Sequence, residues 1–215
     1  MYEILFLCKK TISLPDEELT EILDIWCKCN NLNTKTEESV TITVEENGWE
    51  FQKDNKLTPD GIVGTNTWNT LMPYINGYIN YKIKSGDTFY KIAQDYNTTV
   101  NALIFANPLT DYNNLVIDEE IVIPIGSVVQ TDISYTSDIL KLNLDSFKKI
   151  YPFLEFTIIG RTVLGNPITS IKFGKGPKEI FYNAAIHANE WITTSLLMKF
   201  LENLCKSYVN NAPIF

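Results

Sequence analysis

The chain has 215 residues, of which 45% are hydrophobic, so it is apolar enough to bury cores and too long for one minimal domain. The formal net charge is −8, only residues 131–215 carry more basic than acidic side chains, and no Lys/Arg stripe forms a phosphate-binding face. No stretch is long and apolar enough to cross a bilayer. We therefore expect neither nucleic acid nor membrane as a partner.

The cysteines and the first residues indicate where the chain works. Two of the four cysteines, Cys27 and Cys29, stand two positions apart, unlike a disulfide framework, so we interpret all four as reduced thiols. Residues 1–10 contain a short apolar stretch, but Glu3 precedes it and lysines follow it, the reverse of a signal peptide. These features predict a cytoplasmic protein.

Residues 1–79 are predicted to form a small, mainly helical module. Apolar positions recur at helical spacing over Asp16–Asn30. Residues 40–44 alternate like a strand, and a Pro-Asp-Gly turn at residues 59–61 separates two further helices, the second of which buries Trp68 and Leu71.

Part of this module resembles the peptidoglycan-binding domain family. The shared pattern is Phe-Gln at residues 51–52, then Leu-x-x-Asp-Gly-x-x-Gly-x-x-Thr-Trp at residues 57–68. The family's first half carries a related Asp-Gly turn, which residues 31–48 lack, so we interpret the module as divergent. The alternative is that Trp49, Phe51 and Trp68 are simply core aromatics.

Residues 80–125 are predicted to fold as strand, helix, helix, strand. The first strand contains alternating Tyr81 and Ile83, and the last ends at Pro124. Asp87 and Thr88 can cap the first helix, and Thr99 can cap the second. One small two-layer core is enough for this unit.

This segment resembles a LysM domain over its whole length, through its Gly-Asp-Thr turn, its Asn-Pro pair and its final Ile-Val-Ile-Pro. The resemblance implies binding of N-acetylglucosamine-containing glycans, including peptidoglycan, in a shallow groove between two loops. Structural roles are also open: Gly86 as a turn, Asp87 as a cap and Pro108 as a helix stop. The implied glycan contacts are Gly86, Asp87, Thr88, Phe89, Asn107, Pro108 and Leu109.

A linker over residues 126–137 leads to residues 138–215, which are predicted to begin an α/β domain with a mixed sheet. The last expected strand is apolar at nearly every position, as in a strand covered on both faces. The whole chain is thus predicted to be multidomain α+β. The expected elements of this last segment are a helix at 138–151, strands at 156–160, 168–173 and 180–186, and a helix at 193–208 whose apolar stripe is Leu196, Leu197, Phe200, Leu201 and Leu204.

The chain's single histidine, His187, stands three residues before Glu190, between an apolar run and a predicted helix. A catalytic zinc is held by three protein ligands with one open position, and these two side chains can supply two of the three. A His-x-x-Glu alone is a weak signal, and a histidine serving only the end of a strand is the alternative.

The run from His187 to Ile192, with residues 158–168 before it, resembles the zinc carboxypeptidase family. The order of modules looks like its γ-D-glutamyl-meso-diaminopimelate peptidase branch, which cuts peptidoglycan stem peptides. This resemblance implies a protein associated with the cell wall or the spore. Zinc (Zn²⁺) is the implied cofactor. In that family the third ligand, the clamping arginine, a tyrosine and the catalytic glutamate lie further downstream than Phe215, so we expect the chain to be C-terminally truncated.

Two functions therefore stay open. One is a peptidoglycan-directed zinc metallopeptidase with a LysM module, incomplete as given. The other is a non-catalytic protein that binds the cell wall and its N-acetylglucosamine glycans through LysM and keeps a remnant peptidase domain. We predict that the chain binds zinc weakly through two ligands and has no measurable peptidase activity. The only arginine, Arg161, fits a structural role, and Cys205 no ligand role.

Overall fold

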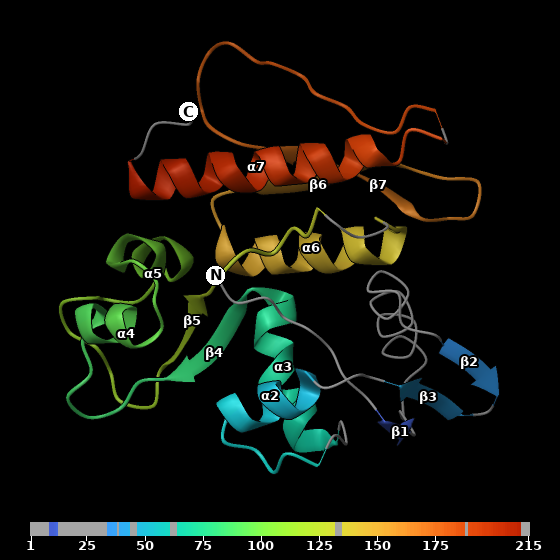
Figure 1. The fold of residues 1–215 in the computed structure, drawn as a ribbon. Coiled ribbons are helices and arrows are strands. Elements are labelled where there is room, and N and C mark those ends of the chain that lie inside the picture. Colours follow the sequence, from blue (N-terminus) through green and yellow to red (C-terminus); the bar gives the residue numbers. More distant parts are fainter. Residues whose placement is uncertain are drawn as a thin grey trace. The chain divides into compact units, whose positions relative to one another are not determined.

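The computed structural model describes residues 9–12, 34–37, 39–43, 47–60, 64–131, 135–187 and 189–211. They belong to two compact units, residues 1–75 with 130–139, and residues 76–129 with 140–215. Helices and small antiparallel sheets make up both units and confirm the multidomain α+β class (Figure 1).

The first unit contains three strands and two helices. Strands β1 (Lys9–Ile12), β2 (Thr34–Glu37) and β3 (Ser39–Thr43) form an antiparallel sheet in the order β1-β3-β2. Helices α2 (Asn47–Asp54) and α3 (Thr65–Asn76) follow. The strand predicted at residues 40–44 and both helices around the Pro-Asp-Gly turn are confirmed. The helix predicted over Asp16–Asn30 lies outside the described residues.

A buried amide connects α2 to α3. Gln52 is 2% exposed and donates from Nε2 to Thr67 Oγ1 at 3.1 Å and to Asp60 Oδ1 at 3.2 Å. Leu71 is buried as predicted, whereas Phe51 and Trp68 are half-buried. The polar pair of Gln52 and Thr67 therefore fixes the turn between the helices.

The second unit begins with the predicted βααβ arrangement: β4 (Tyr78–Lys82), α4 (Phe89–Asp95), α5 (Val100–Ala106) and β5 (Glu120–Pro124). The strands pair antiparallel. The hydroxyls of Thr88 and Thr99 accept the N–H groups of Lys91 and Ala102, so both threonine caps are confirmed. One core joins the layers, made of Ile83, Phe89, Ile92, Ala93, Leu103, Ile121 and Ile123.

The rest of this unit consists of α6 (Ser137–Ile150), the hairpin of β6 (Glu155–Arg161) and β7 (Pro167–Lys172), and α7 (Ile192–Asn210). Both predicted helices and the first two predicted strands are confirmed. The hairpin turns at Gly165, whose φ of +84° suits glycine. Arg161 donates from Nη1 to the Gly165 carbonyl at 2.8 Å, so this arginine has the structural role expected of it.

The third strand predicted in this segment, residues 180–186, is wrong. The run has no regular secondary structure and belongs to no sheet, and Ile180, Phe181 and Ile186 are 77%, 78% and 69% exposed. An apolar run becomes a buried strand only where neighbouring strands accept its backbone hydrogen bonds. The described residues place no strand beside this run.

The buried face of α7 also differs from the predicted one. Leu196 is 69% exposed, and the other residues of the expected leucine stripe are half-buried. Tertiary partners decide which face a helix buries, and here they turn a face that contains a glutamate inward. The buried residues of α7 are Ser195, Met198, Glu202, Cys205 and Val209.

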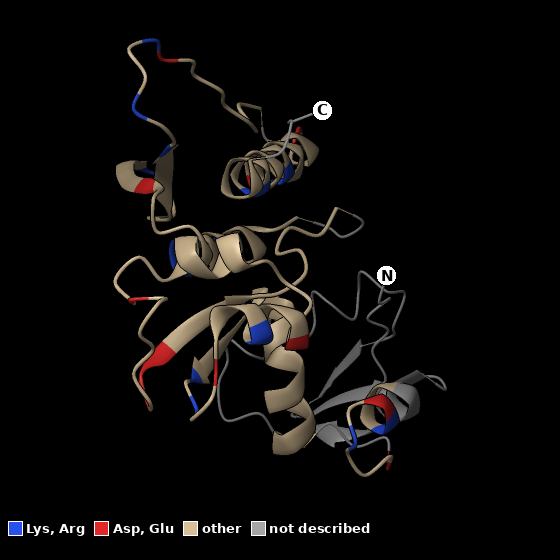
Figure 2. Cartoon of the chain, turned by 90° about the vertical axis from the view of Figure 1, so that its left-hand side faces the viewer, with Lys and Arg blue, Asp and Glu red and all other residues tan. Residues whose placement is uncertain are grey.

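The surface of the described residues carries charges of both signs. Figure 2 shows Lys and Arg interspersed with Asp and Glu along individual elements rather than gathered on one basic face. Within the part of the chain that the structure describes, every helix is too short or too polar to span a bilayer.

Candidate metal and glycan sites

A threonine fixes the backbone that carries His187. The Thr193 hydroxyl accepts the Ala185 N–H at 2.8 Å and donates to the Glu190 carbonyl at 2.7 Å. The Glu190 N–H donates to the His187 carbonyl at 3.0 Å, which closes the turn between the two side chains. Ala185 has a φ of +52°, a left-handed conformation that a non-glycine residue rarely adopts. The first turn of α7 thus holds this segment in a defined shape.

The structure brings His187 and Glu190 together. His187 Nδ1 lies 3.0 Å from Glu190 Oε1, and the two side chains are 73% and 48% exposed. Two ligand atoms bound to one tetrahedral zinc are about 3.4 Å apart, given zinc–nitrogen and zinc–oxygen bonds of about 2.1 Å. The pair needs only a small displacement to hold one cation, and its nitrogen and oxygen donors are of the type that zinc takes.

Within the part of the chain that the structure describes, further ligands are not gathered beside this pair. Among the described residues, no group of three or more His, Cys, Asp or Glu side chains is arranged to hold a metal. Cys205 is fully buried, and burial together with the charge of Glu202 raises the pKa of its thiol to about 12. A protonated, buried thiol is a poor metal ligand, in keeping with the absence of a ligand role for Cys205.

The first of the two predicted glycan-binding loops is fastened by Asp87. Its Oδ2 accepts the Tyr81 hydroxyl and the Lys84 N–H, both at 2.8 Å. The hydrogen bonds from the Lys84 N–H and the Tyr81 hydroxyl lower the pKa of Asp87, although burial opposes this. The Asp87 carboxylate in turn raises the pKa of Tyr81 to about 12. The loop turns at Gly86, whose φ is +83°. Thr88 is exposed and caps α4.

Phe89, also predicted to contact glycan, has its side chain in the core of the βααβ fold, where it is 3% exposed. Only the backbone of this residue can face a ligand. Gly86 has the turn role considered for it, but the cap of α4 is Thr88 and not Asp87, whose carboxylate accepts the Tyr81 hydroxyl and the Lys84 N–H. The ring of Phe89 is occupied by packing.

The second predicted loop is fastened by Asn107. Its Nδ2 donates to the carbonyls of Leu103 at 2.8 Å and Val122 at 2.7 Å, and its Oδ1 accepts the Val122 N–H at 2.7 Å. The amide is thus engaged with α5 and β5. Pro108 and Leu109 follow as exposed residues, Leu109 at 99%.

Both loops are anchored to neighbouring positions of one sheet. Tyr81, which binds Asp87, lies opposite Ile121, and Val122, which binds Asn107, lies opposite Asn80. The sheet therefore sets the position of one loop relative to the other. Further exposed apolar side chains accompany Leu109 on the connection between α5 and β5, namely Tyr112, Val116 and Ile117. The sequence patterns did not single them out.

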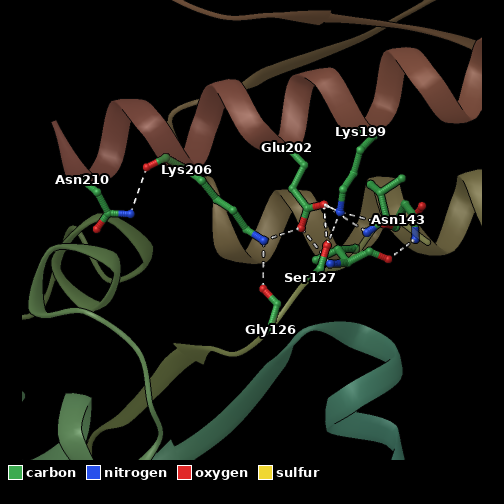
Figure 3. Close-up of polar contacts among 9 residues, drawn as sticks. Gly126, Ser127, Asn143, Lys199, Glu202, Lys206 and Asn210 are labelled. Carbon is green, nitrogen blue, oxygen red and sulfur yellow. Dashed lines mark hydrogen bonds and ion pairs between the residues drawn. The ribbon is translucent and has the colours of Figure 1, made fainter. Parts of the chain in front are cut away.

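Sequence reasoning also missed a buried ion cluster on α7 (Figure 3). Glu202, which is 0% exposed, pairs with Lys199 at 2.9 Å and with Lys206 at 3.0 Å. Its carboxylate accepts the Ser127 hydroxyl at 2.8 Å and the Val128 N–H at 2.8 Å. We refer to Glu202, Lys199, Lys206 and the segment 126–129 as the Glu202 cluster.

The lysines of the cluster also bind the backbone of that segment. Lys199 Nζ donates to the Ser127 hydroxyl and, at 3.0 Å, to the Val129 carbonyl, and Lys206 Nζ donates to the Gly126 carbonyl at 3.0 Å. Burial opposes ionisation of Glu202, but Lys206, Lys199 and the Val128 N–H together hold its pKa below the ordinary value. The ionised form of Glu202 is therefore favoured within the cluster.

Three family matches follow the order of the motifs. Residues 142–215 match the zinc carboxypeptidase family, residues 81–124 match the LysM domain, and residues 50–71 match the peptidoglycan binding domain. Each match covers its own segment of the chain. His187 and Glu190 lie within the first, and both predicted glycan-binding loops lie within the second.

Similar proteins cover parts of the same segments. Over 81 residues the chain is 40% identical to Gamma-D-glutamyl-L-diamino acid endopeptidase 1 of Lysinibacillus sphaericus, covering 38% of this chain and 20% of that protein. Over 91 residues it is 36% identical to the Uncharacterized protein YqgT of Bacillus subtilis (strain 168), covering 41% and 24%. Over 75 residues it is 35% identical to the Secreted LysM effector ELP2 of Colletotrichum higginsianum (strain IMI 349063), covering 32% and 43%.

The matched segments thus span about a fifth to a quarter of the two bacterial proteins. No solved structure matches the chain significantly.

Proposed function

We propose that the chain is part of a peptidoglycan-directed zinc metallopeptidase of the γ-D-glutamyl-meso-diaminopimelate peptidase type. The proposal is supported by the LysM domain at residues 81–124 and the zinc carboxypeptidase-like residues at 142–215. In this proposal LysM binds wall glycan and the peptidase-like segment acts on stem peptides. The observation that carries it is the convergence of His187 Nδ1 and Glu190 Oε1 to 3.0 Å at the start of α7. The domain limits 1–79, 80–125, 126–137 and 138–215 belong to the same proposal.

The metal half assigns His187 and Glu190 as two zinc ligands. Bound zinc polarises a scissile carbonyl and lowers the pKa of its water. In this chain Glu190 would bind through Oε1, on a turn held by the Thr193 hydroxyl, and His187 through Nδ1. A third ligand, a general base and a cation for the substrate carboxylate would come from residues other than this pair, so we expect weak zinc binding and no hydrolysis by residues 1–215 alone.

The glycan half assigns the two anchored loops to an acetamido sugar. Such a sugar needs backbone donors and acceptors beside an apolar platform. In the loop around Gly86 the side chain of Asp87 holds the loop, so the backbone groups of the loop are the ones offered to the sugar. In the other loop, Leu109 offers an apolar side chain that is 99% exposed. Wall association follows from this half of the proposal.

One observation favours the second candidate, a non-catalytic wall-binding protein. His187 and Glu190 are hydrogen-bonded to each other, so each side chain already has a partner without a metal. In this alternative the βααβ domain still binds glycan, and the peptidase-like segment is a remnant that neither holds zinc tightly nor cleaves a substrate.

Two assays on the full chain test the glycan half and the expected inactivity. In a pull-down we expect chitin oligomers and peptidoglycan to retain the chain, and Leu109→Ala to weaken retention while Ile159→Ala, an exposed control outside the LysM domain, leaves it unchanged. Failure of the parent chain to bind either glycan would remove the glycan half. Mass spectrometry of a γ-D-glutamyl-meso-diaminopimelate peptide should show no cleavage by residues 1–215; cleavage would contradict both the expected inactivity and the non-catalytic alternative.

A further inference from the structure

Side chains of α7 bind the segment that follows the LysM domain. Residues 126–129 belong by sequence to a linker, yet Val128 and Val129 are 3% and 1% exposed. Their backbone N–H groups point at the Glu202 carboxylate, at 2.8 and 3.4 Å. If the linker left, Glu202 would lose the hydrogen bonds from Ser127, Val128 and Val129, and Val128 and Val129 would become exposed.

The LysM domain touches α7 a second time through α5. The ring of Phe105 on α5 lies 5.5 Å from the ring of Tyr208 and 5.8 Å from that of Phe153. At the start of α5 the Thr99 hydroxyl donates to Asn210 Oδ1 at 2.8 Å while it caps the helix. These contacts involve different residues from the Glu202 cluster, so the domain is held at two separate places.

Both attachments leave the predicted glycan loops free. Leu109 is 99% exposed, and Asp87 and Asn107 bind only groups of the βααβ fold itself. The face of the LysM domain that meets α7 is therefore not the face that carries the loops.

The contacts made by α5 and the metal-ligand pair lie at opposite ends of α7. Thr99 and Phe105 meet Asn210 and Tyr208 in the last turn, and Glu190 stands just before the first turn (Figure 1). A helix of 19 residues at about 1.5 Å per residue is about 28 Å long. The contacts of α5 and the His187–Glu190 pair are therefore about one helix length apart along α7.

We propose that α7 is a rigid spacer: the Glu202 cluster and the contact between α5 and the end of α7 lock the LysM domain to the peptidase-like segment, so that glycan loops and the His187–Glu190 pair keep one fixed separation. Glu202 is in this sense a positioning residue. The spacing role rests on the proposed function, but the lock itself does not.

Pulsed electron paramagnetic resonance on the full chain tests the lock. Spin labels are attached at Lys91→Cys on α4 and Leu196→Cys on α7, both exposed positions, with Cys8, Cys27 and Cys29 replaced by serine and the buried Cys205 retained. We expect one narrow distance distribution in this parent and a broad one in Glu202→Gln. The control Asp145→Asn, which removes an exposed ion pair with Lys148 on α6, should keep the narrow distribution.

Circular dichroism shows whether each variant is folded. Should Glu202→Gln fail to fold, Lys206→Met, which removes one charge and keeps much of the side-chain packing, is expected to broaden the distribution. A broad distribution in the parent, or an unchanged narrow one in the folded variants, would overturn the lock. No glycan, zinc or substrate is present in this measurement, so its result is independent of the glycan-binding and cleavage assays.

Discussion

Two glutamates, one in the middle of α7 and one just before its first turn, show how differently the same side chain can be used. Glu202 is 0% exposed and meets two lysines, a hydroxyl and backbone N–H groups. Glu190 is 48% exposed in its side chain and meets His187. The first carboxylate is fully occupied by the protein, whereas the second has one partner and open space around it.

This difference separates a structural charge from a candidate ligand. A buried carboxylate with every oxygen engaged stabilises the arrangement of the elements around it, and a metal could reach it only after those bonds broke. An exposed carboxylate beside an imidazole can exchange that hydrogen bond for a metal at small cost. The predictions below test the contrast by changing one member of each pair.

The largest expected effect comes from the same substitution at the two positions. Glu202→Gln should lower the free energy of unfolding by roughly 2–4 kcal/mol, because it leaves two lysines beside a neutral buried group. Glu190→Gln should change it by about 0.5 kcal/mol or less, since that side chain is exposed. Urea unfolding of both variants measures the difference, and equal losses would show that the two carboxylates do not differ in this way.

The next effect concerns the segment held by Glu202. Gly77 has a φ of +72°, and a Cβ there would lie 2.5 Å from Val128 Cγ2. Gly77→Ala should therefore push Val128 out of place and cost roughly 1–3 kcal/mol of unfolding free energy. Gly174→Ala is the matched control, because Gly174 also has a positive φ, of +88°, and a Cβ there meets nothing within 4 Å. A stable Gly77→Ala chain in urea would mean that Val128 is not tightly held.

The contribution of Glu202 should also depend on pH. Its pKa is lowered in the folded chain, since the lysines and the Val128 N–H outweigh burial, so its stabilisation is complete above the ordinary carboxyl pKa and is lost as the pH falls through the lowered one. The groups that face it are Lys199, Lys206 and Cys205 on α7 and Tyr151 just after α6.

The measurement is the gap in unfolding free energy between the parent and Glu202→Gln from pH 7 down to pH 3. The gap should narrow as the pH falls, because only the parent has a carboxylate to protonate at this position. A gap that stays constant over the whole range would contradict an ionised Glu202.

The smallest expected effect tests the second attachment of the LysM domain. Thr88→Ala and Thr99→Ala each remove a helix cap and should each cost about 1 kcal/mol. Thr99→Ala should lower the free energy of unfolding by a few tenths of a kcal/mol more than Thr88→Ala does, because Thr99 also donates a hydrogen bond to Asn210. A few tenths of a kcal/mol is about what a weak surface hydrogen bond contributes. Paired urea titrations measure the difference, and a larger loss for Thr88→Ala would contradict the contact.

Elements with local signals could be predicted from the sequence. The βααβ unit, the caps Thr88 and Thr99 and the Arg161 contact at the hairpin depend on residues close together in the chain, and the structure has them as predicted. The approach of His187 to Glu190 likewise follows from their spacing at a helix start. Local sequence carries such features because their partners lie within a few residues.

Features that depend on distant partners could not be predicted. Residues 180–186 have the composition of a buried strand, but a strand forms only with neighbours to pair with. Lys199, Glu202 and Lys206 lie three and four residues apart, a pattern typical of a solvated helix face. Only the distant segment 126–129, which supplies N–H and carbonyl partners, turns that face inward.

Zinc titration of the 215-residue chain, by calorimetry or by competition with a chelating dye, tests the central claim most directly. We predict weak binding that is lost in His187→Ala and in Glu190→Gln and is retained in folded Glu202→Gln, because only the exposed pair faces a metal. Binding that survives loss of His187 or Glu190, or that disappears in folded Glu202→Gln, would contradict the assignment of the two glutamates.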